Sequence, residues 1–531
     1  MERPRPSSPR LSSPQCSFGG DRSTRRSFLT RASAIATASA LFAQVASADD
    51  SAQSETPVSI KVDRHRLMRC RLELEVKGNV KVPSDPVQSK KTKTALPVNS
   101  TASLDYEERL LSPEGTVEES EVVAAERFYH TASNLSVLNK TSVEHQLRES
   151  MRHVIVRREM LPEVVYSPEG YFRHDELSLL KIPVSSVAID RLLPAQAVIK
   201  GDRYELDLES LRSVLNLSTL ESGKVEAVVS AIDDGNVRFQ IEGDVEGSVD
   251  GVSTRMRLLG KMTYDRSVKA CTWLAMALHE TREISRAEPG FDILAKVRLL
   301  RQPLEQPVRL PAEAHVVDFE NPPPENRLFV ELKSDHCQAA VMMDRRWRMI
   351  SDDPGQCVMR MVEHDNSIAQ CNLRKLTDLP AGKHLTLEAF EADVKRTLGN
   401  QLVQLVEADQ GLSALGLRIL RVVADGETQG VPVRWIMMHF SDDTGKRVHS
   451  TFTMAGQKVE DFAGCDAQFG DSLQFLSSGK GEFKSADPTA QASAEKQTSP
   501  IVAEPNDASL ELSAPEAEIA TKPPQSASDL K

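Results

Sequence analysis

A histidine followed by an acidic residue is the first place in this sequence where the residue types could do chemistry. His279 and Glu280 begin like the helix of a zinc protease, in which two His four positions apart bind the metal and the Glu beside the first acts as a base. Position 283 is Glu, so the second ligand is missing. The surrounding residues also follow the pattern of a strand, where this ligand geometry fails. Zinc chemistry is therefore not expected here.

A wider set of metal-binding residue types occurs between positions 336 and 384. No two of them have the spacing of a recognised site, and predicted strands separate them, so we expect no metal. The sequence GLSALG at 411–416 has the wrong spacing for a G-x-S-x-G nucleophile, and no phosphate loop or dinucleotide glycine pattern occurs. The sequence thus predicts no catalytic residues, no cofactor and no enzyme. The residues considered as metal ligands are His336, Cys337, His364, Asp365, Cys371 and His384.

The cysteines leave two alternatives open. Six follow residue 48, and an even number in an exported protein permits disulfides. The other alternative is that they are buried free thiols, which behave as small apolar groups. Two of them, Cys271 and Cys371, lie inside predicted strands and are expected in the core. The full set is Cys70, Cys271, Cys337, Cys357, Cys371 and Cys465.

The N-terminal 48 residues are typical of an export signal. An Arg-rich segment precedes a short Ala-rich apolar stretch that ends in the small-residue pattern of a cleavage site. The sequence TRRSFLT (24–30) resembles the twin-arginine signal, with Thr30 where that family usually has Lys. The resemblance implies export by that route, cleavage after Ala48, and a periplasmic or secreted protein. The residues that carry the signal and the cleavage site are Arg25, Arg26, Phe28, Leu29, Ala46 and Ala48.

The charge of the chain disfavours several kinds of partner. The net charge is −12, and residues 1–48 carry +5 (seven Arg against Glu2 and Asp21), so the remaining chain carries −17. A protein this acidic is not expected to bind nucleic acid or anionic lipid through its overall charge. The short basic segment 88–94 is interpreted as a solvated loop.

Composition divides the rest of the chain into two folded units. Proline is concentrated in residues 304–326, which predicts an extended linker between a unit at 57–303 and a unit at 327–477. Residues 478–531 are rich in Ser, Ala, Glu and Pro and nearly free of aromatic residues. Such a segment cannot bury enough apolar surface to offset its ordering entropy, so a disordered acidic tail is expected.

A hairpin in the first unit can be predicted down to its register. Asp250 and Gly251 form a two-residue turn signal, which pairs Val249 with Val252 and Val245 with Met256. In that register one face of the hairpin is apolar and the other pairs acidic with basic residues, as a half-buried antiparallel sheet requires. Segments 185–193 and 207–217 before it have helical spacing.

The first unit is therefore expected to be a long curved antiparallel sheet with helices against its concave face. This arrangement resembles the half-barrels of the LolA and LolB type of periplasmic lipoprotein carriers. The resemblance concerns topology, and it implies that an apolar ligand could lie in the concave face.

The second unit contains a well-marked helix among strands. Thr386 is the predicted N-cap, Leu385 and Phe390 are placed to pack together at the helix start, and Gly399 is placed to end it. A last helix is expected at 457–476. The order of strands and helices resembles the PsbP/Mog1-like fold, an α/β/α sandwich with an antiparallel sheet. That family consists of binding and assembly factors, so the resemblance implies a non-catalytic role.

Together these observations predict an α+β protein with two functional alternatives. The first is an exported, non-enzymatic binding or assembly protein of the bacterial envelope, with an envelope protein as partner and no membrane span after cleavage. The alternative is a carrier of an apolar ligand, a lipid or lipoprotein, in the curved sheet; an unrecognised enzyme comes third. Whether the protein's own helices fill the concave face discriminates between the first two, because a filled face leaves no room for a ligand.

Overall fold

A computed structural model describes residues 56–63, 67–81, 95–112, 123–249, 251–284, 289–363 and 366–476. The described residues belong to one compact unit that begins at Pro57. The predicted signal and cleavage residues (Arg25, Arg26, Phe28, Leu29, Ala46 and Ala48), the basic segment 88–94 and the predicted tail 478–531 lie outside the described residues.

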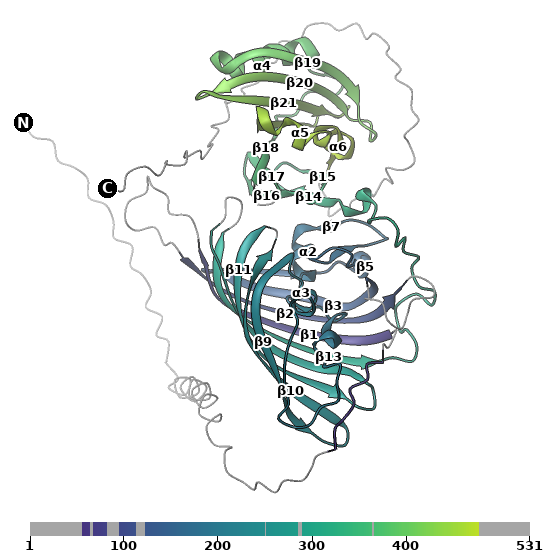
Figure 1. The fold of residues 1–531 in the computed structure, drawn as a ribbon. Coiled ribbons are helices and arrows are strands. Elements are labelled where there is room, and N and C mark those ends of the chain that lie inside the picture. Colours follow the sequence, from purple (N-terminus) through teal and green to yellow (C-terminus); the bar gives the residue numbers. More distant parts are fainter. Residues whose placement is uncertain are drawn as a thin grey trace, which may run out of the picture. The chain divides into compact units, whose positions relative to one another are not determined.

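A twelve-stranded sheet dominates the first half of the chain (Figure 1). Its strands alternate between apolar and polar residues, which places the apolar side chains on one face, called the inner face below. The strand order is β6-β5-β3-β2-β1-β13-β12-β11-β10-β9-β8, with β4 paired to β3. The bounds are β1 Leu67–Lys81, β2 Ala95–Leu111, β3 Ala124–Leu138, β4 Thr141–Gln146, β5 His153–Arg157, β6 Val164–Tyr166, β8 Arg203–Glu205, β9 Thr219–Ile232, β10 Asn236–Val249, β11 Val252–Asp265, β12 Ala270–Arg282 and β13 Gly290–Pro303.

The predicted hairpin register is confirmed. Strands β10 and β11 pair Val249 with Val252 and Val245 with Met256, and the register continues unbroken to Asn236 and Asp265. Gly251 has a φ of 82°, a conformation that glycine adopts without the steric cost of a Cβ atom. The alternation of apolar and charged residues sets the register, because a slip of one residue would turn every apolar side chain outwards.

The sheet is held together by one long-range pairing. Strand β1 pairs with β2, its neighbour in sequence, and also with β13, more than two hundred residues later. This pairing joins the hairpins β9–β13 to the strands β1–β3 in one continuous curved surface (Figure 1).

Part of the inner face is covered by residues 181–217, called the covering segment below. It contains the short 3-10 helix η2 (Ile189–Leu192), the edge strand β8 and the helix α3 (Leu208–Leu215). The Asp207 side chain caps α3 by accepting from the Ser210 N–H, and Asn216 ends it in a left-handed conformation. The helical spacing predicted for 185–193 thus yields only one 3-10 turn.

A four-stranded sheet joins segments that lie far apart in the sequence. Its order is β23-β15-β14-β7, and β7 pairs in parallel with β14. Strand β7 precedes helix α2 (His174–Leu180), whereas β14 and β15 follow the Pro-rich segment. The bounds are β7 Phe172–Arg173, β14 Val330–Ser334, β15 Ala339–Met343 and β23 Gln474–Phe475.

A seven-stranded antiparallel sheet completes the fold, in the order β16-β17-β18-β22-β21-β20-β19. Helix α4 (Leu387–Leu398) begins and ends as predicted: the Thr386 hydroxyl accepts from the Ala389 N–H, and Gly399 follows the last turn. The bounds of the strands are β16 Trp347–Asp353, β17 Gln356–Glu363, β18 Asn366–Lys375, β19 Leu402–Leu412, β20 Arg418–Thr428, β21 Val431–Ser441 and β22 Arg447–Ala455.

The helix predicted at 457–476 is wrong in its length. The chain forms α5 (Val459–Phe462) and α6 (Cys465–Ser472), and Gly464 between them has a φ of 80°, which a continuous helix does not contain. The two short helices still present aromatic side chains to the sheet: Phe462 and Phe469 pack on Phe452 at ring distances of 5.4 and 5.1 Å.

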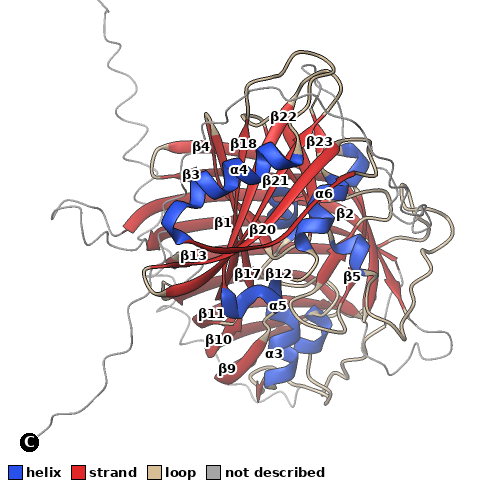
Figure 2. Ribbon diagram, turned by 90° about the horizontal axis from the view of Figure 1, so that it is seen from above, coloured by secondary structure: helices blue, strands red, loops and turns tan. Residues whose placement is uncertain are grey.

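The predicted α+β class is also wrong: the protein consists mainly of antiparallel β-structure (Figure 2). In place of a layer of helices, the curved sheet is covered by loops and short helices of seven or eight residues, α2 and α3. The C-terminal sheet is likewise not a full α/β/α sandwich, because the single helix α4 covers only part of one face. The spacing of Leu and Val indicated helices correctly in places but did not show how short they are.

The Pro-rich segment 304–326 is extended, and part of it is held against the outer face of the large sheet. Glu107, on that face and fully buried, accepts from the backbone N–H groups of Val308, Arg309 and Leu310 at 2.8 to 3.3 Å. The Glu107 carboxylate also contacts His130, with 2.6 Å between Oε1 of Glu107 and Nε2 of His130. We call residues 304–321 the strap.

All six cysteines of the described part are free and buried. Of the two alternatives that the sequence left open, the structure therefore favours buried thiols, and Cys271 and Cys371 lie in the core as predicted. No helix among the described residues is long and apolar enough to cross a membrane.

Candidate functional site

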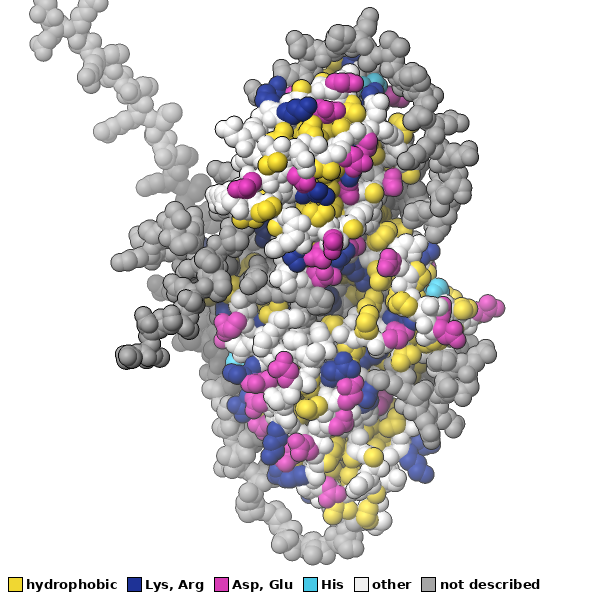
Figure 3. Space-filling view, turned by 45° about the horizontal axis from the view of Figure 1, so that its top comes forward, with side chains coloured by type: hydrophobic (Ala, Val, Ile, Leu, Met, Phe, Trp, Pro, Cys, Tyr) yellow, Lys and Arg dark blue, Asp and Glu magenta, His cyan; other side chains and the backbone are white. Residues whose placement is uncertain are grey.

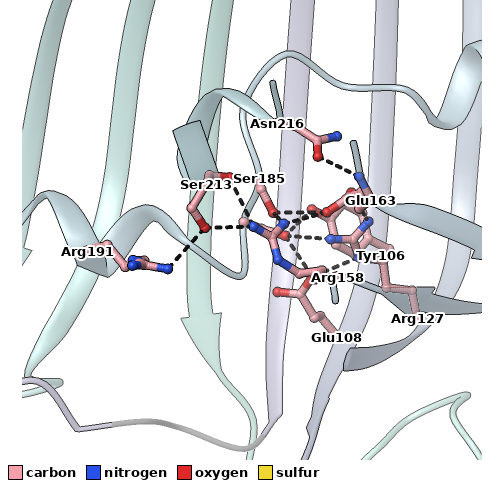
Figure 4. A network of polar contacts seen from close by, with 10 residues as sticks. Tyr106, Glu108, Arg127, Arg158, Glu163, Ser185, Arg191, Ser213 and Asn216 are labelled. Atoms are coloured by element: carbon pink, nitrogen blue, oxygen red, sulfur yellow. Dashed lines mark hydrogen bonds and ion pairs between the residues drawn. The ribbon is translucent and has the colours of Figure 1, made fainter. Parts of the chain in front are cut away.

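The covering segment is attached to the inner face through a buried network of charges (Figure 4). Arg127 on β3 donates from Nε to Glu108 on β2 at 2.7 Å and also contacts Glu163, 3.3 Å away. Arg158 donates to Glu163 at 2.6 Å. All four charged side chains are almost completely buried.

Hydroxyl groups of the covering segment complete the network. Ser186 contacts Glu108 at 2.7 Å and accepts from Tyr106 at 2.8 Å, while Ser185 and Ser213 accept from Arg158. These hydrogen bonds therefore join the serines of the covering segment to Tyr106, Glu108 and Arg158.

The charges of this network compensate one another. Burial alone raises the pKa of the Glu163 carboxyl, but the guanidinium groups of Arg127 and Arg158 lower it below its usual range. Burial raises the pKa of Tyr106 well above its usual range, so the phenol stays protonated and remains a donor. With two cations and two anions in contact, the network has no reactive group in an unusual state, and its role is to fix the covering segment.

A second attachment lies on the neighbouring strands. Arg301 on β13, also buried, contacts Asp190 of η2 at 2.8 Å, and the same carboxylate accepts from the Cys271 N–H at 2.7 Å. Leu192 of the same turn accepts through its carbonyl from Tyr204. The covering segment therefore closes the part of the inner face between β2 and β12.

Further along the same strands the inner face stays apolar but is only half-buried. The pairing places Val98, Gly78 and Ile293 in one row across β2, β1 and β13, and Leu96, Val80 and Phe291 in the next. Gly78 provides no side chain in the middle of the first row. We call these six residues, together with Val76, the inner strip. All seven residues are half-buried, whereas Cys70 and Leu72 on the same face are buried. The inner strip is the candidate binding site.

Polar groups border the inner strip on both sides. On the β2–β3 side, Ser100 and Ser136 are hydrogen bonded at 2.7 Å, and Asn134 donates to Ser100 at 3.1 Å. On the β12 side, Glu280 accepts from Thr254 at 2.8 Å and from Arg282 at 2.9 Å. An apolar row between polar borders matches a ligand with an apolar body and a polar end.

Of the residues that the sequence analysis considered for metal binding, Cys337 and Cys371 lie near one another in the core, without forming a metal-binding group. His279 lies on strand β12, as expected, and contacts Asp292 at 2.8 Å. His336 contacts Asp352, and Cys337 donates to the Leu373 carbonyl. His364 and Asp365 lie outside the described residues. Within the described residues there is no group of three or more His, Cys, Asp or Glu arranged to hold a metal.

On the face shown in Figure 3, Lys and Arg alternate with Asp and Glu. Exposed ion pairs occur on the large sheet, such as Arg255 with Glu246 at 2.7 Å and Arg203 with Glu226 at 2.8 Å.

Comparison with known proteins gives no family for this chain. No family model and no curated protein match it. Among solved structures, lipovitellin, described for its lipid–protein interactions, is 8% identical with a TM-score of 0.28, over 64% of this chain and 32% of its own. A protein from Bacteroides thetaiotaomicron is 10% identical with a TM-score of 0.21, over 28% of this chain and 49% of its own. A Pseudomonas aeruginosa protein of unknown function is 9% identical with a TM-score of 0.16, over 26% of this chain and 92% of its own.

These scores are too low to carry an argument about function, and this chain spans only a third to a half of the first two structures. The function proposed below is argued from the residues of this chain.

The sequence analysis missed both the buried network and the inner strip. A signal for the network was present: Glu108 follows Leu104 and Tyr106 in the apolar phase of its strand, and Arg127 lies between Ala125 and Tyr129. A charge in an apolar phase indicates a buried, partnered group. The inner strip had no comparable signal, because a half-buried valine and a fully buried one follow the same alternation.

Proposed function

We propose that this protein is a non-enzymatic binding protein that holds an amphipathic ligand, such as a single lipid, against the inner strip. The observation that carries the proposal is that the apolar inner face extends beyond the part closed by the covering segment. Leaving apolar surface half-covered costs free energy, which a bound hydrocarbon chain would recover at roughly 25 cal/mol per Å² of apolar surface buried.

The structure of the covering segment supports the same proposal. Because charged and hydrogen-bonded contacts fix this segment, it does not slide along the sheet to cover the inner strip. The covering segment therefore fills part of the concave face, and the half-buried apolar surface that remains is that of the inner strip. We further propose that the protein works in the bacterial envelope, on the basis of its predicted export signal.

The test is direct binding of a fluorescent lipid to the purified chain after residue 48. We expect saturable, single-site binding of a fatty acid probe such as cis-parinaric acid. The substitution Val98→Asp should weaken binding at least about tenfold, since a carboxylate against the hydrocarbon chain would lose its hydration.

The matched control is Asn99→Asp, the next residue on the same strand, which points to the outer face and is exposed. It adds the same charge and should leave binding unchanged. If Val98→Asp does not fold, Ile293→Thr provides a second variant, because Thr is β-branched like Ile and carries no charge. Absence of probe binding, or equal weakening by Val98→Asp and Asn99→Asp, would contradict the proposal.

A protein partner is the second candidate, and the edge strand β19 favours it. This strand pairs with β20 on one side, and its side chains Val403 and Leu412 are 73% and 74% exposed. An extended segment of a partner could add to this edge as a further strand. A photoreactive residue at position 403 should then form one discrete adduct with an envelope protein, whereas one at Thr444, in an exposed turn, should form none.

A further inference from the structure

One face of the seven-stranded sheet changes character along its strands. Under helix α4 it is apolar, with Val433, Trp435 and Met437 of β21 among the buried residues. The next residues of β21 in the same phase are His439 and Ser441, which are buried as well. This face of the sheet therefore remains buried beyond Met437, but its side chains there are polar.

The register makes a compact block of four polar residues from this region. Strand β22 places His449 opposite His439 and Arg447 opposite Ser441. Neighbouring strands lie about 5 Å apart, and residues two positions apart on one strand lie about 7 Å apart. The four side chains therefore share one small area, which we call the His–Arg block.

Several polar atoms of the His–Arg block have no hydrogen-bond partner within the described part of the chain. This holds for both ring nitrogens of His439, for Nε2 of His449, for Oγ of Ser441 and for Nη1 of Arg447. The two histidines are only 1% and 3% exposed. A buried polar group without a partner costs about 1–3 kcal/mol, so unpartnered groups on four neighbouring residues indicate that something else binds there.

The local charge is positive. Burial, His449 and Arg447 lower the pKa of His439 to about 3, and burial together with Arg374 lowers that of His449 to about 4, so both imidazoles are neutral at pH 7. The positive charge is then that of Arg447, with Arg418 opposite Ser441 on β20 and Arg374 opposite His449 on β18.

Arg447, Arg418 and Arg374 each have a partner on a neighbouring segment. Burial lowers the pKa of Arg447, and the carboxylate that acts against this effect is that of Asp378, an exposed residue. Arg418 and Arg374 are hydrogen bonded to the neutral amides of Gln410 and Gln356.

A loop and a helix enclose the block. Phe390 of α4 packs on both imidazoles, with ring distances of 6.1 and 5.9 Å. The loop before α4 is fixed to the strand ends: Arg447 Nε donates to the Thr377 carbonyl at 2.6 Å, and Leu379 N–H donates to Gly445 at 2.9 Å. A Cβ atom at Gly445 would lie 1.9 Å from the Leu379 carbonyl oxygen, so the close approach of this loop requires glycine.

We propose that the His–Arg block binds a single small oxyanion of the size of phosphate or sulfate. Arg447 supplies the charge, and the neutral His439, His449 and Ser441 each supply one hydrogen-bond donor. Donors on two strands and in two rows match the several oxygens of a tetrahedral anion better than the two oxygens of a carboxylate. The site is independent of the inner strip and does not rest on the lipid-binding proposal.

The test is calorimetric titration of the purified full chain with inorganic phosphate, sulfate and acetate at constant ionic strength. We expect one site for phosphate or sulfate and an at least about tenfold weaker response to acetate. Arg447→Gln and His439→Phe should each raise the dissociation constant at least about tenfold, because each removes a donor that the anion would need.

Arg360→Gln is the matched control. Arg360 lies on β17 on the same face of the sheet, two strands away from β22, and its loss should change the dissociation constant less than twofold. Ser441→Ala is the small change to use if Arg447→Gln does not fold. Absence of binding of both tetrahedral anions, undiminished binding by His439→Phe, or binding of zinc in their place would overturn the proposal.

Discussion

Two groups of buried polar side chains lie against sheets of this protein, and they differ in how completely they are partnered. In the large sheet, Arg127 and Arg158 contact Glu108 and Glu163, and serines fill the remaining positions. In the seven-stranded sheet, most polar atoms of the His–Arg block have no partner among the described residues, although Arg447 Nε donates to the Thr377 carbonyl. Both groups lie in the apolar phase of their strands, so burial alone does not distinguish them.

The difference teaches how a scaffold contact can be distinguished from a binding site. Desolvating a charge costs several kcal/mol, which a neighbouring opposite charge and hydrogen bonds can offset. Where the offset comes from within the chain, the group holds the fold together. Where the chain supplies no partner, the free energy remains for a ligand to recover.

Removing one charge from the partnered network should have the largest effect. Arg158→Met leaves Glu163 buried with one of its two cations missing, and we expect a loss of about 3–5 kcal/mol in the free energy of unfolding. Denaturant unfolding at pH 7 measures it. Arg191→Met is the control, since Arg191 contacts the same network only at its edge, 3.4 Å from Ser213. A loss below about 1 kcal/mol for Arg158→Met would mean that the network does not hold the covering segment.

Removing the charge that holds the strap should come next. Glu107→Gln weakens the contacts to Val308, Arg309 and Leu310, and we expect a loss of about 1–3 kcal/mol at pH 7. Burial alone would raise the pKa of Glu107. The backbone hydrogen bonds have the larger combined effect and lower this pKa below its ordinary value of 4.5.

A lowered carboxyl pKa stabilises the fold above pH 4.5, and this stabilisation disappears as the pH falls through the lowered pKa. The difference between wild type and Glu107→Gln in denaturant unfolding should therefore be constant from pH 8 to pH 6 and decrease in acid. A difference that instead grows on acidification would show that Glu107 is not the charged acceptor.

Replacing an unpartnered group should act in the opposite direction. In phosphate-free buffer, His439→Phe removes a buried polar ring and should raise the free energy of unfolding by about 1 kcal/mol. Because the pKa of His439 is lowered to about 3, the unfolded chain takes up a proton below pH 6.5 that the folded chain does not.

Wild-type stability is therefore lost between pH 6.5 and pH 3 at this position, and the advantage of His439→Phe should increase over that range. Thermal unfolding at pH 7.5 and pH 5 measures the change. A variant that is less stable than wild type at both values would show that His439 has an internal partner.

Exposed pairs set the lower end of the scale. Exchanging Glu246 and Arg255, which are 51% and 72% exposed, should change the free energy of unfolding by less than about 1 kcal/mol. The pair lies on the outer face of the hairpin, where water screens both charges. A larger change would indicate that this face is covered in the folded protein.

The parts of the fold that could be predicted from sequence are local. The β10–β11 register followed from one turn and one alternation, and the limits of α4 followed from Thr386 and Gly399. The joining of β1 to β13 could not be predicted in this way, because no local pattern specifies a partner two hundred residues away. The same is true of β7, a two-residue strand whose pairing depends on β14.

The candidate sites could be predicted less well than the fold. Glu and Arg are common residues in this sequence. Only the position of Glu108 and Arg127 in the apolar phase of their strands distinguishes them from exposed charged residues. His439 and Ser441 extend the apolar phase of Val433, Trp435 and Met437, but whether such residues have partners depends on strand β22 and helix α4, which the alternation does not place.

The buried thiols have a consequence for when this protein can fold. A thiol reacts with oxidants as its thiolate, and burial raises the pKa of Cys357 to about 12 and that of Cys371 well above its usual range, so almost no thiolate is present at pH 7. In the unfolded chain the same thiols would be accessible and would cross-link under oxidising conditions. A twin-arginine signal, as the sequence predicts, exports a chain that has already folded in a reducing compartment. These six cysteines would then be buried, and inaccessible to oxidants, before the protein enters an oxidising compartment.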